Sequence, residues 1–347
     1  MVRCGRVRLT MAAAVAAATM ACGLPASASA LSALQVNEAE FRGGGKGEGI
    51  DPAVLRAQVL LDRLRFSPGS IDGRTGDNFV NALDAFATAN NLKPAGHLTP
   101  EIYRALVATY EGPVLVPYTI AEADVKGPFP KVIPKDYEEM AELPTLNYTS
   151  AAEGLAEKFH LSRALLEALN PGAKFDTAGE VIVAAAARPD PGRGGRKPPG
   201  ASTAPAGEKA RVARIEVDKP ARLLRAFTEG DELIGSYPAS IGSEDKPAPS
   251  GRFEVRTVAW NPSYTYNPEY GFKGQKATKK VEVPGGPNNP VGAVWIDLTA
   301  DSYGIHGTPE PERVGKTASH GCVRLTNWDV RDLASMVHKG TVVEFKE

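Results

Sequence analysis

Residues 305–325, with the sequence IHGTPEPERVGKTASHGCVRL, gather the reactive side chains of this chain into one short segment. The segment holds His306 and His320, two of the five histidines, and Cys322, the one cysteine far from the N-terminus. A glycine directly follows each histidine and permits a tight turn or the close approach of a substrate. A thiol with nearby imidazoles provides a cysteine nucleophile and its base. We therefore predict that nucleophilic catalysis takes place in this segment.

Two histidines compete for the role of base. A cysteine attacks as the thiolate, and a free thiol has a pKa of about 8.5, so a proton acceptor is needed. His320 and Cys322 lie two residues apart and would share one face of a strand. His306 lies earlier, and a loop that folds back could bring it equally close. The spacing leaves both candidates open. The amides of Gly321 and Cys322 could form an oxyanion hole for acyl transfer.

Three other roles for the cysteine compete with this hypothesis. Two histidines and one thiol could bind zinc with an open position, although no carboxylate or second cysteine stands at metal-motif spacing. A redox-sensing thiol would lack a resolving cysteine. A buried structural cysteine is common, but glycine and histidine neighbours are not typical of a core. We expect no metal and no other cofactor.

Residues 1–30 have the three parts of a secretory signal, namely a basic start, a short apolar core and a small-residue cleavage site. These parts are Arg3, Arg6 and Arg8, then Met11–Ala21, then Ala28-Ser29-Ala30. The core is too short to span a bilayer, and no transmembrane helix is expected in the mature chain. We predict cleavage after Ala30, export to the periplasm or cell envelope, and Cys322 as the remaining thiol. A retained N-terminal helix and a lipoprotein anchored through Cys22 are the alternatives.

The composition indicates a globular protein with several domains. With 347 residues, of which 42% are hydrophobic and 23% charged, the chain suits about two or three domains. The net charge of −1 gives no indication of a nucleic-acid partner. Residues 31–50 are small, polar and glycine-rich, and they predict a flexible tether.

Residues 51–111 predict three short helices separated by turns. Asp51-Pro52 begins the first helix, residues 78–90 form the second, and Thr99-Pro100 begins the third. The segments FSPGSIDGRTGDNFVNALDAFATANNL and HLTPEIYRAL resemble the three-helix peptidoglycan-binding domain. That family usually has a Phe-Gln pair where this chain has Phe86-Ala87, so a glycan-binding domain and a spacer bundle are both hypotheses.

Residues 144–187 predict a β-α-α-β unit, which follows an irregular connection over residues 112–143. The expected elements are a strand at Leu146–Thr149, helices at Ala151–Phe159 and Ser162–Leu169, and a strand at Val181–Val183. The stretch LNYTSAAEGLAEKFHLSRALLEALNPG resembles a LysM module, which binds glycans that contain N-acetylglucosamine. The Gly-Asp pair that is usual before its first helix is absent, so the copy is degenerate. Residues 188–208, rich in proline and glycine, predict a linker.

Residues 209–347 predict a mainly β domain. Strands are expected at Arg214–Val217, Ala221–Phe227, Leu233–Ser240, Phe253–Ala259, Val291–Leu298 and Thr341–Phe345, and a helix at Asp329–Met336. Few helices and many short strands favour an all-β sandwich or barrel. The stretch from Trp260 to Gly286 predicts a long loop over the site. It carries three tyrosines and the cluster Lys276, Lys279 and Lys280.

This C-terminal domain resembles the catalytic domain of the L,D-transpeptidases, the YkuD family. The matching residues are Ile305-His306-Gly307-Thr308 and Ser319-His320-Gly321-Cys322-Val323-Arg324-Leu325, with Pro249-Ser250-Gly251-Arg252-Phe253 upstream and Gly340-Thr341-Val342-Val343 downstream. The resemblance implies a YkuD-type β-sandwich, here preceded by a small three-helix bundle and a small α+β LysM-like module. It implies that Cys322 attacks a tetrapeptide stem after its third residue, releases D-alanine, and forms a thioester. An acceptor amine then resolves the thioester to give a 3→3 cross-link.

The resemblance also implies a role for each site residue. His306 is the base, the carbonyl of Gly307 orients its imidazole, His320 supports the pocket, and Gly321 with Cys322 supplies oxyanion donors. Arg324, Ser319 and Tyr266 are the expected substrate-binding residues. The implied partners are peptidoglycan stems and glycan strands, with no nucleic acid, and carbapenems are expected to acylate Cys322. The rival functions are an L,D-carboxypeptidase or cross-link-cleaving hydrolase on the same fold, and a non-catalytic wall-binding protein.

Overall fold

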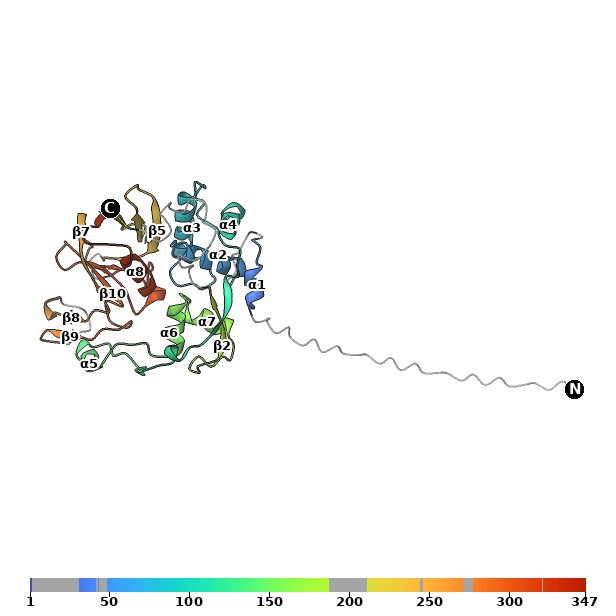
Figure 1. The fold of residues 1–347 in the computed structure, drawn as a ribbon, viewed down its shortest axis with the longest axis horizontal. Coiled ribbons are helices and arrows are strands. Elements are labelled where there is room, and N and C mark those ends of the chain that lie inside the picture. The colour runs from blue at the N-terminus through green and yellow to red at the C-terminus, as the bar shows by residue number, and fades with distance from the viewer. Residues whose placement is uncertain are drawn as a thin grey trace. The chain divides into compact units, whose positions relative to one another are not determined.

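The computed structural model (Figure 1) describes residue 1 and residues 31–41, 43, 49–186, 211–243, 246–270, 277–319 and 321–347. Apart from residue 1, the predicted signal peptide lies outside these residues, as does the predicted linker at 188–208. Residues Leu31–Glu347 form one unit, and it contains the helices and strands of the described residues. None of these helices is both long and apolar enough to cross a bilayer.

A short helix replaces part of the predicted tether. Helix α1 spans Ala33–Asn37 and begins with a capping box between Ser32 and Gln35. Val36 is 0% exposed, and Asn37 exchanges hydrogen bonds of 2.9 and 2.8 Å with the backbone of Leu115. The prediction of a flexible tether is therefore wrong for residues 33–37, because capping and burial hold them in place.

The three predicted helices of residues 51–111 are confirmed. They are α2 (Pro52–Arg63), α3 (Asp77–Ala89) and α4 (Pro100–Val107). Asp51 caps α2 by accepting from the amides of Ala53 and Val54, and Thr99 caps α4. The buried faces of these helices share a single core with the following β-α-α-β unit.

A β-α-α-β unit is present, but its first strand is not where we predicted it. The unit consists of β1 (Leu115–Thr119), α6 (Ala151–Lys158), α7 (Arg163–Leu169) and β2 (Val181–Ala185), with β1 antiparallel to β2. Residues 146–149 are not a strand, because Leu146 is buried in a different cluster and its amide donates to Gly285. The predicted irregular connection thus contains β1, the 3-10 helix η1 (Glu122–Asp124) and helix α5 (Tyr137–Ala141).

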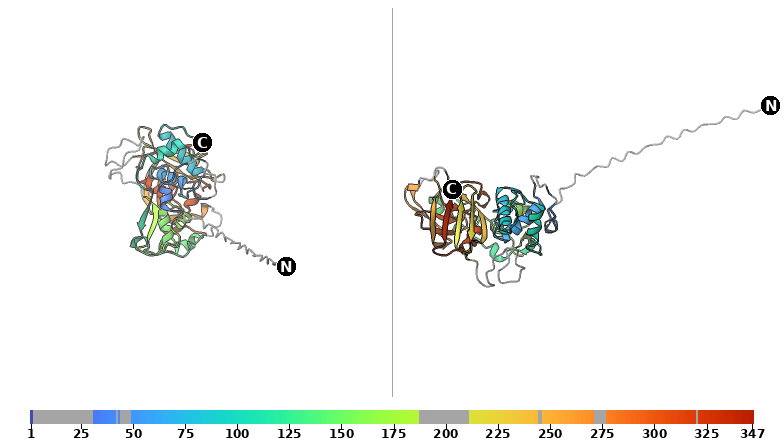
Figure 2. Two further views of the ribbon diagram at one scale, coloured as in Figure 1. Left: turned by 90° about the vertical axis from the view of Figure 1, so that its right-hand side faces the viewer. Right: turned by 90° about the horizontal axis from the view of Figure 1, so that it is seen from above.

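The prediction of a mainly β C-terminal domain is confirmed. Among the described residues, its large sheet has nine strands, namely β3 (Arg214–Asp218), β4 (Leu223–Phe227), β5 (Leu233–Pro238), β6 (Ser240–Ile241), β7 (Gly251–Trp260), β10 (Val294–Leu298), β11 (Gly304–His306), β12 (Val323–Arg324) and β13 (Val342–Lys346). They form one sheet in the order β5-β4-β3-β13-β7-β10-β11-β12-β6, and Figure 2 shows strands of this sheet side by side. Between strands of this sheet, the chain also forms the 3-10 helix η3 (Pro311–Arg313) and helix α8 (Asn327–Ala334).

The long strand β7 joins the two halves of this sheet. Its first part pairs with β13, for example Glu254 with Val342, and its second part pairs with β10, for example Trp260 with Val294. Apolar side chains from both halves, together with those of α8, enclose one core. The first and last strands of the domain, β3 and β13, pair in parallel inside the sheet.

The predicted loop from Trp260 to Gly286 contains a small hairpin. Strands β8 (Tyr264–Tyr266) and β9 (Val281–Val283) pair in an antiparallel manner, and the 3-10 helix η2 (Pro268–Tyr270) follows β8. The hairpin packs against α5 and Leu146, which come from the segment between β1 and α6. Lys276 lies outside the described residues, while Lys279 and Lys280 are exposed. The hairpin is therefore held from the N-terminal half of the chain.

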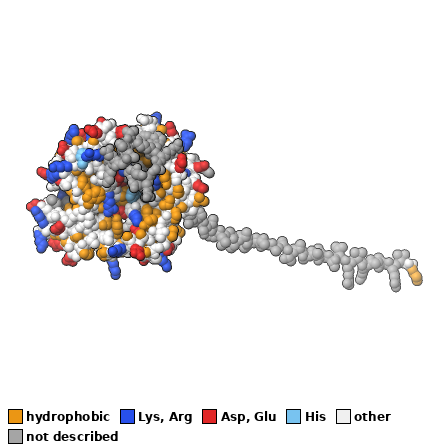
Figure 3. Space-filling model, viewed as in Figure 1, with side chains coloured by type: hydrophobic (Ala, Val, Ile, Leu, Met, Phe, Trp, Pro, Cys, Tyr) orange, Lys and Arg blue, Asp and Glu red, His pale blue; other side chains and the backbone are white. Residues whose placement is uncertain are grey.

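Further polar contacts join the helical part to the C-terminal domain. The guanidinium of Arg65 lies 3.1 Å from the carboxylate of Asp332, and Ser67 Oγ donates to Asp329 Oδ2 at 2.9 Å. Asn78 Nδ2 donates to the carbonyl of Val314 at 2.9 Å. Acidic and basic side chains are interspersed on the face shown in Figure 3, in agreement with a net charge of −1.

The buried carboxyl group of Asp329 makes the stability of this junction depend on pH. Asp329 is 1% exposed, and burial together with the nearby Asp62 raises its pKa from 3.8 to about 7. The Asp329 carboxyl group stays protonated to a higher pH in the folded chain than in the unfolded chain. Its contribution to the free energy of unfolding is therefore lost as the pH rises from about 4 to about 7. We expect the Tm of Asp329→Asn to fall less than that of the wild type between about pH 5 and pH 8. Equal falls in thermal melts of the two proteins would contradict this assignment.

Candidate active site

Two short neighbouring strands bring the reactive cysteine beside residue 304. Strand β12 pairs in parallel with β11, so that Val323 lies opposite Ile305 and Arg324 opposite His306. Cys322 directly precedes β12, and the backbone of Gly304 forms a hydrogen bond with its sulfur. The Sγ atom also lies 3.9 Å from the carbonyl oxygen of Ser302. The thiol is therefore fixed at the start of β11.

The thiol of Cys322 is held in its neutral form at neutral pH. Burial raises the pKa of Cys322, because a thiolate would lose its hydration. The hydrogen bond from Gly304 and the charge of Arg324 act in the opposite direction but do not outweigh burial. A base is therefore needed at the moment of attack.

His306 has the protonation state that a base requires. The ring is 4% exposed and stacks on Trp295 with a centroid distance of 5.5 Å. Its Nδ1 atom donates to the carbonyl oxygen of Gly307 at 2.6 Å, which leaves the lone pair on Nε2. Burial, followed by the charge of Arg324, lowers the pKa of His306 to about 3, against the opposing effect of the carbonyls of Gly307 and Val291.

The strand register places the three reactive side chains together. Continuing the β11–β12 pairing by one residue sets Cys322 opposite Gly304, and alternate residues of a strand share a face. Cys322 and Arg324 therefore face the same way as His306. The arrangement combines a neutral thiol, a neutral imidazole and a guanidinium on one face, which suits attack by the sulfur on an acyl carbon.

Ser319 and Gly321 shape the turn before the cysteine. Ser319 is 3% exposed, and its Oγ donates to the carbonyl of Cys322 at 2.5 Å. The same Oγ accepts from the amide of Gly321 at 3.3 Å. Gly321 has a φ of +114°, and a side chain there would press on the ring of Tyr303. The Gly321 amide would have to break its hydrogen bond to Ser319 Oγ before it could donate a hydrogen bond to an oxyanion.

Arg324 brings a positive charge to the site. Its Nε atom is buried and has no hydrogen-bond partner in the part of the chain that the structure describes. Burial lowers the pKa of Arg324, while Glu310 and Cys322 act to raise it. A guanidinium remains charged under these conditions, because its ordinary pKa is so high. The side chain can therefore accept a carboxylate or another anionic group.

His320 and Tyr266 are predicted site residues that the structure does not place beside Cys322. His320 lies outside the described residues, so its contacts, in a metal site or in the pocket, stay a prediction. Tyr266 is 2% exposed, and its ring lies 4.7 Å from that of Tyr137 in the cluster beneath the hairpin. A contact between Tyr266 and a peptide would need the hairpin to move.

Asn327 is a site residue that the sequence did not reveal. Its Oδ1 accepts from the amide of Ala293 at 2.9 Å, and a side chain at Gly307 or Gly292 would collide with this oxygen. Its Nδ2 donates at 3.0 Å to Glu157 Oε2, which belongs to helix α6. Thr326 is a typical helix-capping residue and marks Asn327 as the start of a helix, but it does not indicate that the Asn327 side chain contacts Ala293 and Glu157.

The fold and the site define a mainly β domain with a histidine on one strand and a cysteine directly before the neighbouring strand. Residues 212–345 match the family model YkuD, described as the L,D-transpeptidase catalytic domain. This part of the chain is therefore similar to the L,D-transpeptidase catalytic domains of the YkuD family. The expectation drawn from the sequence motifs is confirmed at this level.

Individual relatives match over the same domain. The putative L,D-transpeptidase YkuD of Bacillus licheniformis is 35% identical over 130 residues, which are 38% of this chain and 63% of that protein. The probable L,D-transpeptidase YbiS of Escherichia coli K12 is 32% identical over 138 residues, which are 38% of this chain and 44% of that protein. The chain thus spans less than two thirds of the length of these relatives.

A solved structure shows a weaker likeness. L,D-transpeptidase 3 from Mycobacterium tuberculosis, in complex with a faropenem-derived adduct, is 18% identical with a TM-score of 0.33. The match covers 39% of this chain and 61% of that one.

Proposed function

We propose that this chain is an exported cell-wall L,D-transpeptidase that forms 3→3 cross-links in peptidoglycan. The observation that carries the proposal is the placement of Cys322 beside Gly304, two residues from the neutral, buried His306 on the same strand face. The match of residues 212–345 to the family model supports the same reaction class.

In the acylation step, His306 takes a proton while the sulfur attacks. The Nε2 lone pair accepts the thiol proton, and Sγ forms a bond to the carbonyl carbon after the third residue of a tetrapeptide stem. The carbonyl oxygen gains negative charge near the amide of Cys322 and the guanidinium of Arg324. The intermediate then collapses, the C–N bond breaks, and D-alanine leaves with the proton returned by His306. Throughout, the Nδ1–H bond to Gly307 holds the ring in place.

In the second step, an acceptor amine resolves the thioester. The amine attacks the acyl carbon, gives a proton to His306, and displaces Cys322 as the sulfur leaving group, which then regains a proton. If water takes the place of the amine, the same machinery gives an L,D-carboxypeptidase or a cross-link-cleaving hydrolase. The acylation chemistry is common to all three, so the acceptor decides among them.

Arg324 is the strongest candidate for substrate recognition. Its charge acts on both Cys322 and His306, and its Nε lacks a hydrogen-bond partner among the described residues. We propose that it holds a carboxylate of the stem, since guanidinium–carboxylate pairs are strong and oriented. In the same proposal, Ser319 supports the backbone of Cys322. Tyr266 contacts the substrate only if the hairpin of β8 and β9 moves.

The N-terminal half is proposed to anchor the enzyme to the wall. Its three-helix bundle and β-α-α-β unit fit the resemblances to a peptidoglycan-binding domain and a LysM module. Export through cleavage after Ala30 places the mature protein in the periplasm or cell envelope. A non-catalytic wall-binding protein would need neither the Cys322 nor the His306 geometry.

Mass spectrometry of the purified chain incubated with disaccharide-tetrapeptide tests the proposed reaction. We expect a thioester on Cys322 with loss of D-alanine, followed by a dimer that bears a 3→3 link. Tripeptide without dimer would instead identify a carboxypeptidase. No adduct with this substrate or with a carbapenem would contradict the enzyme and leave the wall-binding alternative.

The pKa values of the site predict a flat pH profile for acylation by a carbapenem. The competent form has a neutral thiol and a neutral imidazole, and the pKa of His306 is lowered to about 3 while that of Cys322 is raised. This form therefore dominates from about pH 5 to about pH 8, and the second-order rate constant should change less than about threefold there. Stopped-flow or mass-spectrometric rates would check this. A tenfold rise centred near the ordinary pKa of histidine would contradict it.

A further inference from the structure

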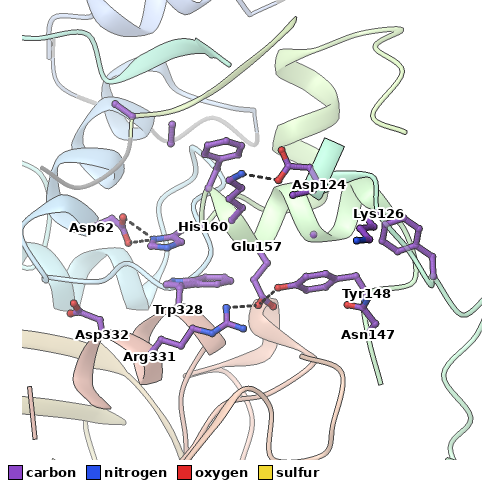
Figure 4. Close-up of a pocket in the computed structure, with 17 residues that line it drawn as sticks. Asp62, Asp124, Lys126, Asn147, Tyr148, Glu157, His160, Trp328, Arg331 and Asp332 are labelled. Carbon is purple, nitrogen blue, oxygen red and sulfur yellow. Dashed lines mark hydrogen bonds and ion pairs between the residues drawn. The ribbon is translucent and has the colours of Figure 1, made fainter. Parts of the chain in front are cut away.

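Residues 125–147, here called the α5 arm, leave the β-α-α-β unit and return to it at the same helix. Just before the arm, Asp124 Oδ1 lies 2.7 Å from Lys158 Nζ, and just after it the Tyr148 hydroxyl donates to Glu157 Oε1 at 2.7 Å. Both partners belong to α6, and Figure 4 shows Asp124, Tyr148 and Glu157 around one cavity. The two ends of the arm are therefore fixed on one helix, and the segment between them can extend to another part of the fold.

The middle of the α5 arm packs on the hairpin of the C-terminal domain. Helix α5 lies beside β8 and β9 (Figure 1). The ring of Tyr137, at the start of α5, lies 4.7 Å from that of Tyr266 and 5.6 Å from that of Tyr264. Beyond α5, the amide of Leu146 donates to the carbonyl of Gly285 at 3.0 Å. The arm therefore holds Tyr137 against side chains of the C-terminal domain.

Tyr137 lies within electrostatic reach of Arg324 in the candidate active site. Burial, and then the nearby Tyr266, raises the pKa of Tyr137, whereas the charge of Arg324 and a hydrogen bond with Tyr264 act to lower it. In return, Tyr137 acts to raise the pKa of Arg324. Because burial dominates, the phenol keeps its proton at neutral pH. A hydroxyl group can donate one hydrogen bond and accept others, so the bond with Tyr264 is compatible with a bond to a substrate.

A protonated phenol beside a guanidinium provides two kinds of donor for a carboxylate. The Arg324 Nε atom is buried and lacks a hydrogen-bond partner among the described residues. A charged N–H group and a neutral O–H group that approach the same carboxylate bind it more tightly than either group does alone. A ligand without the negative charge gains less from the same donors. Such a site would select an anionic substrate.

The position of Arg324 on its strand indicates which carboxylate it meets. Cys322 and Arg324 lie two residues apart on one face, which corresponds to about 6.6 Å along a strand. In the proposed reaction, the sulfur attacks the carbonyl carbon of the third stem residue. The carboxylate of the fourth residue lies one residue, roughly 3.5 Å, beyond that carbon. A long arginine side chain on this face can therefore reach the carboxylate of the departing D-alanine.

We propose that Tyr137, a residue of the N-terminal half, binds the terminal carboxylate of the tetrapeptide stem together with Arg324. The proposal rests on the proposed function and deepens it, because it assigns the ligand of Arg324 and adds a second donor from outside the catalytic domain. The N-terminal half then takes part in substrate selection as well as in the proposed anchoring to the wall.

Steady-state kinetics of the full chain with two matched donors test the proposal. The donors are disaccharide-tetrapeptide and the same compound with its terminal carboxylate converted to a carboxamide, and the readout is release of D-alanine or D-alaninamide. We expect Tyr137→Phe to lower kcat/KM about tenfold for the carboxylate donor and to leave it within about twofold for the carboxamide donor. The substitution keeps the ring that packs on Tyr266, so the Tm should stay close to that of the wild type.

Tyr110→Phe is the matched control for this experiment. Tyr110 is likewise a half-buried tyrosine of the N-terminal half beside an arginine, since its ring lies 3.9 Å from the guanidinium of Arg63. Arg63 belongs to α2 and donates to the carbonyl of Ala186 at 3.0 Å, within the N-terminal half. We expect Tyr110→Phe to change kcat/KM by less than about twofold with either donor.

The possible failures can be told apart. If Tyr137→Phe changes neither donor, or both donors equally, the assignment of Tyr137 to the carboxylate is overturned, while turnover by the wild type still supports the proposed function. If the wild type releases neither product, the proposed function fails, and the assignment of Tyr137 fails with it. If the wild type turns over only the carboxylate donor, the terminal charge is required. A loss in Tyr137→Phe that Tyr110→Phe does not share then supports the assignment, and equal rates of the two variants overturn it.

Discussion

Replacement of Cys322 by alanine should lower turnover of disaccharide-tetrapeptide by about four orders of magnitude or more. The change removes the only sulfur that the described residues place beside His306, and no covalent intermediate can form. The expected readout is loss of D-alanine release together with loss of the thioester adduct.

A folding control separates chemistry from stability in this experiment. Cys322→Ala deletes one atom from a partly exposed side chain, so its Tm should stay close to that of the wild type. His306→Gln provides the partner variant, since it keeps a polar side chain but removes the base, and about a 10²–10⁴-fold loss is expected. Appreciable acyl transfer by Cys322→Ala would show that another group is the nucleophile.

Asn327→Ala is expected to lower kcat by about 10²-fold with little change in KM. The Asn327 amide fixes the backbone at Ala293 and packs against Gly307, and the carbonyl of Gly307 holds His306. Without the amide, this backbone can relax, and the imidazole loses its fixed direction. The residue does not touch the reacting atoms, so it is a positioning residue.

Glu157→Gln tests whether this support extends into the helical part of the chain. Glutamine can still accept from Asn327 through its side-chain oxygen, whereas Glu157→Ala leaves the Asn327 amide short of one partner. We expect Glu157→Gln to keep most of the activity and Glu157→Ala to lose about tenfold in kcat. The pH profile of carbapenem acylation gives a second readout, because a displaced His306 should regain a higher pKa. Equal losses in kcat and Tm with an unchanged profile would indicate a merely structural role.

The sequence predicted the helices and most long strands because their patterns are local. Asp51 and Thr99 mark helix starts by their own side chains, and α2 and α4 begin there. The strand misplaced at Leu146 shows the limit of such patterns. Its apolar residue is buried by a tertiary contact with the backbone of Gly285, and sequence alternation cannot distinguish this from a strand.

The choice of base was also beyond the reach of spacing alone. Strands β11 and β12 have only three and two residues, so they give no periodic signal. Their parallel register is what sets Cys322 near His306. Glu157 and Asn327 lie 170 residues apart, and neither stands in a motif that indicates the other. Contacts of this kind follow from packing between modules rather than from local chemistry.

The parallel pairing of β3 with β13 determines when the catalytic domain can first acquire its fold. Residues 342–346 fill the place between β3 and β7, so a chain that ends before them leaves two sheet edges open. Open edges of this kind recruit other strands and promote aggregation. Contacts between distant parts of a chain also form slowly, because loop closure comes before any gain in pairing. We therefore expect Cys322 and His306 to meet in a stable site only after the last strand has been synthesised, so that a nascent or truncated chain carries the thiol without its base held in place.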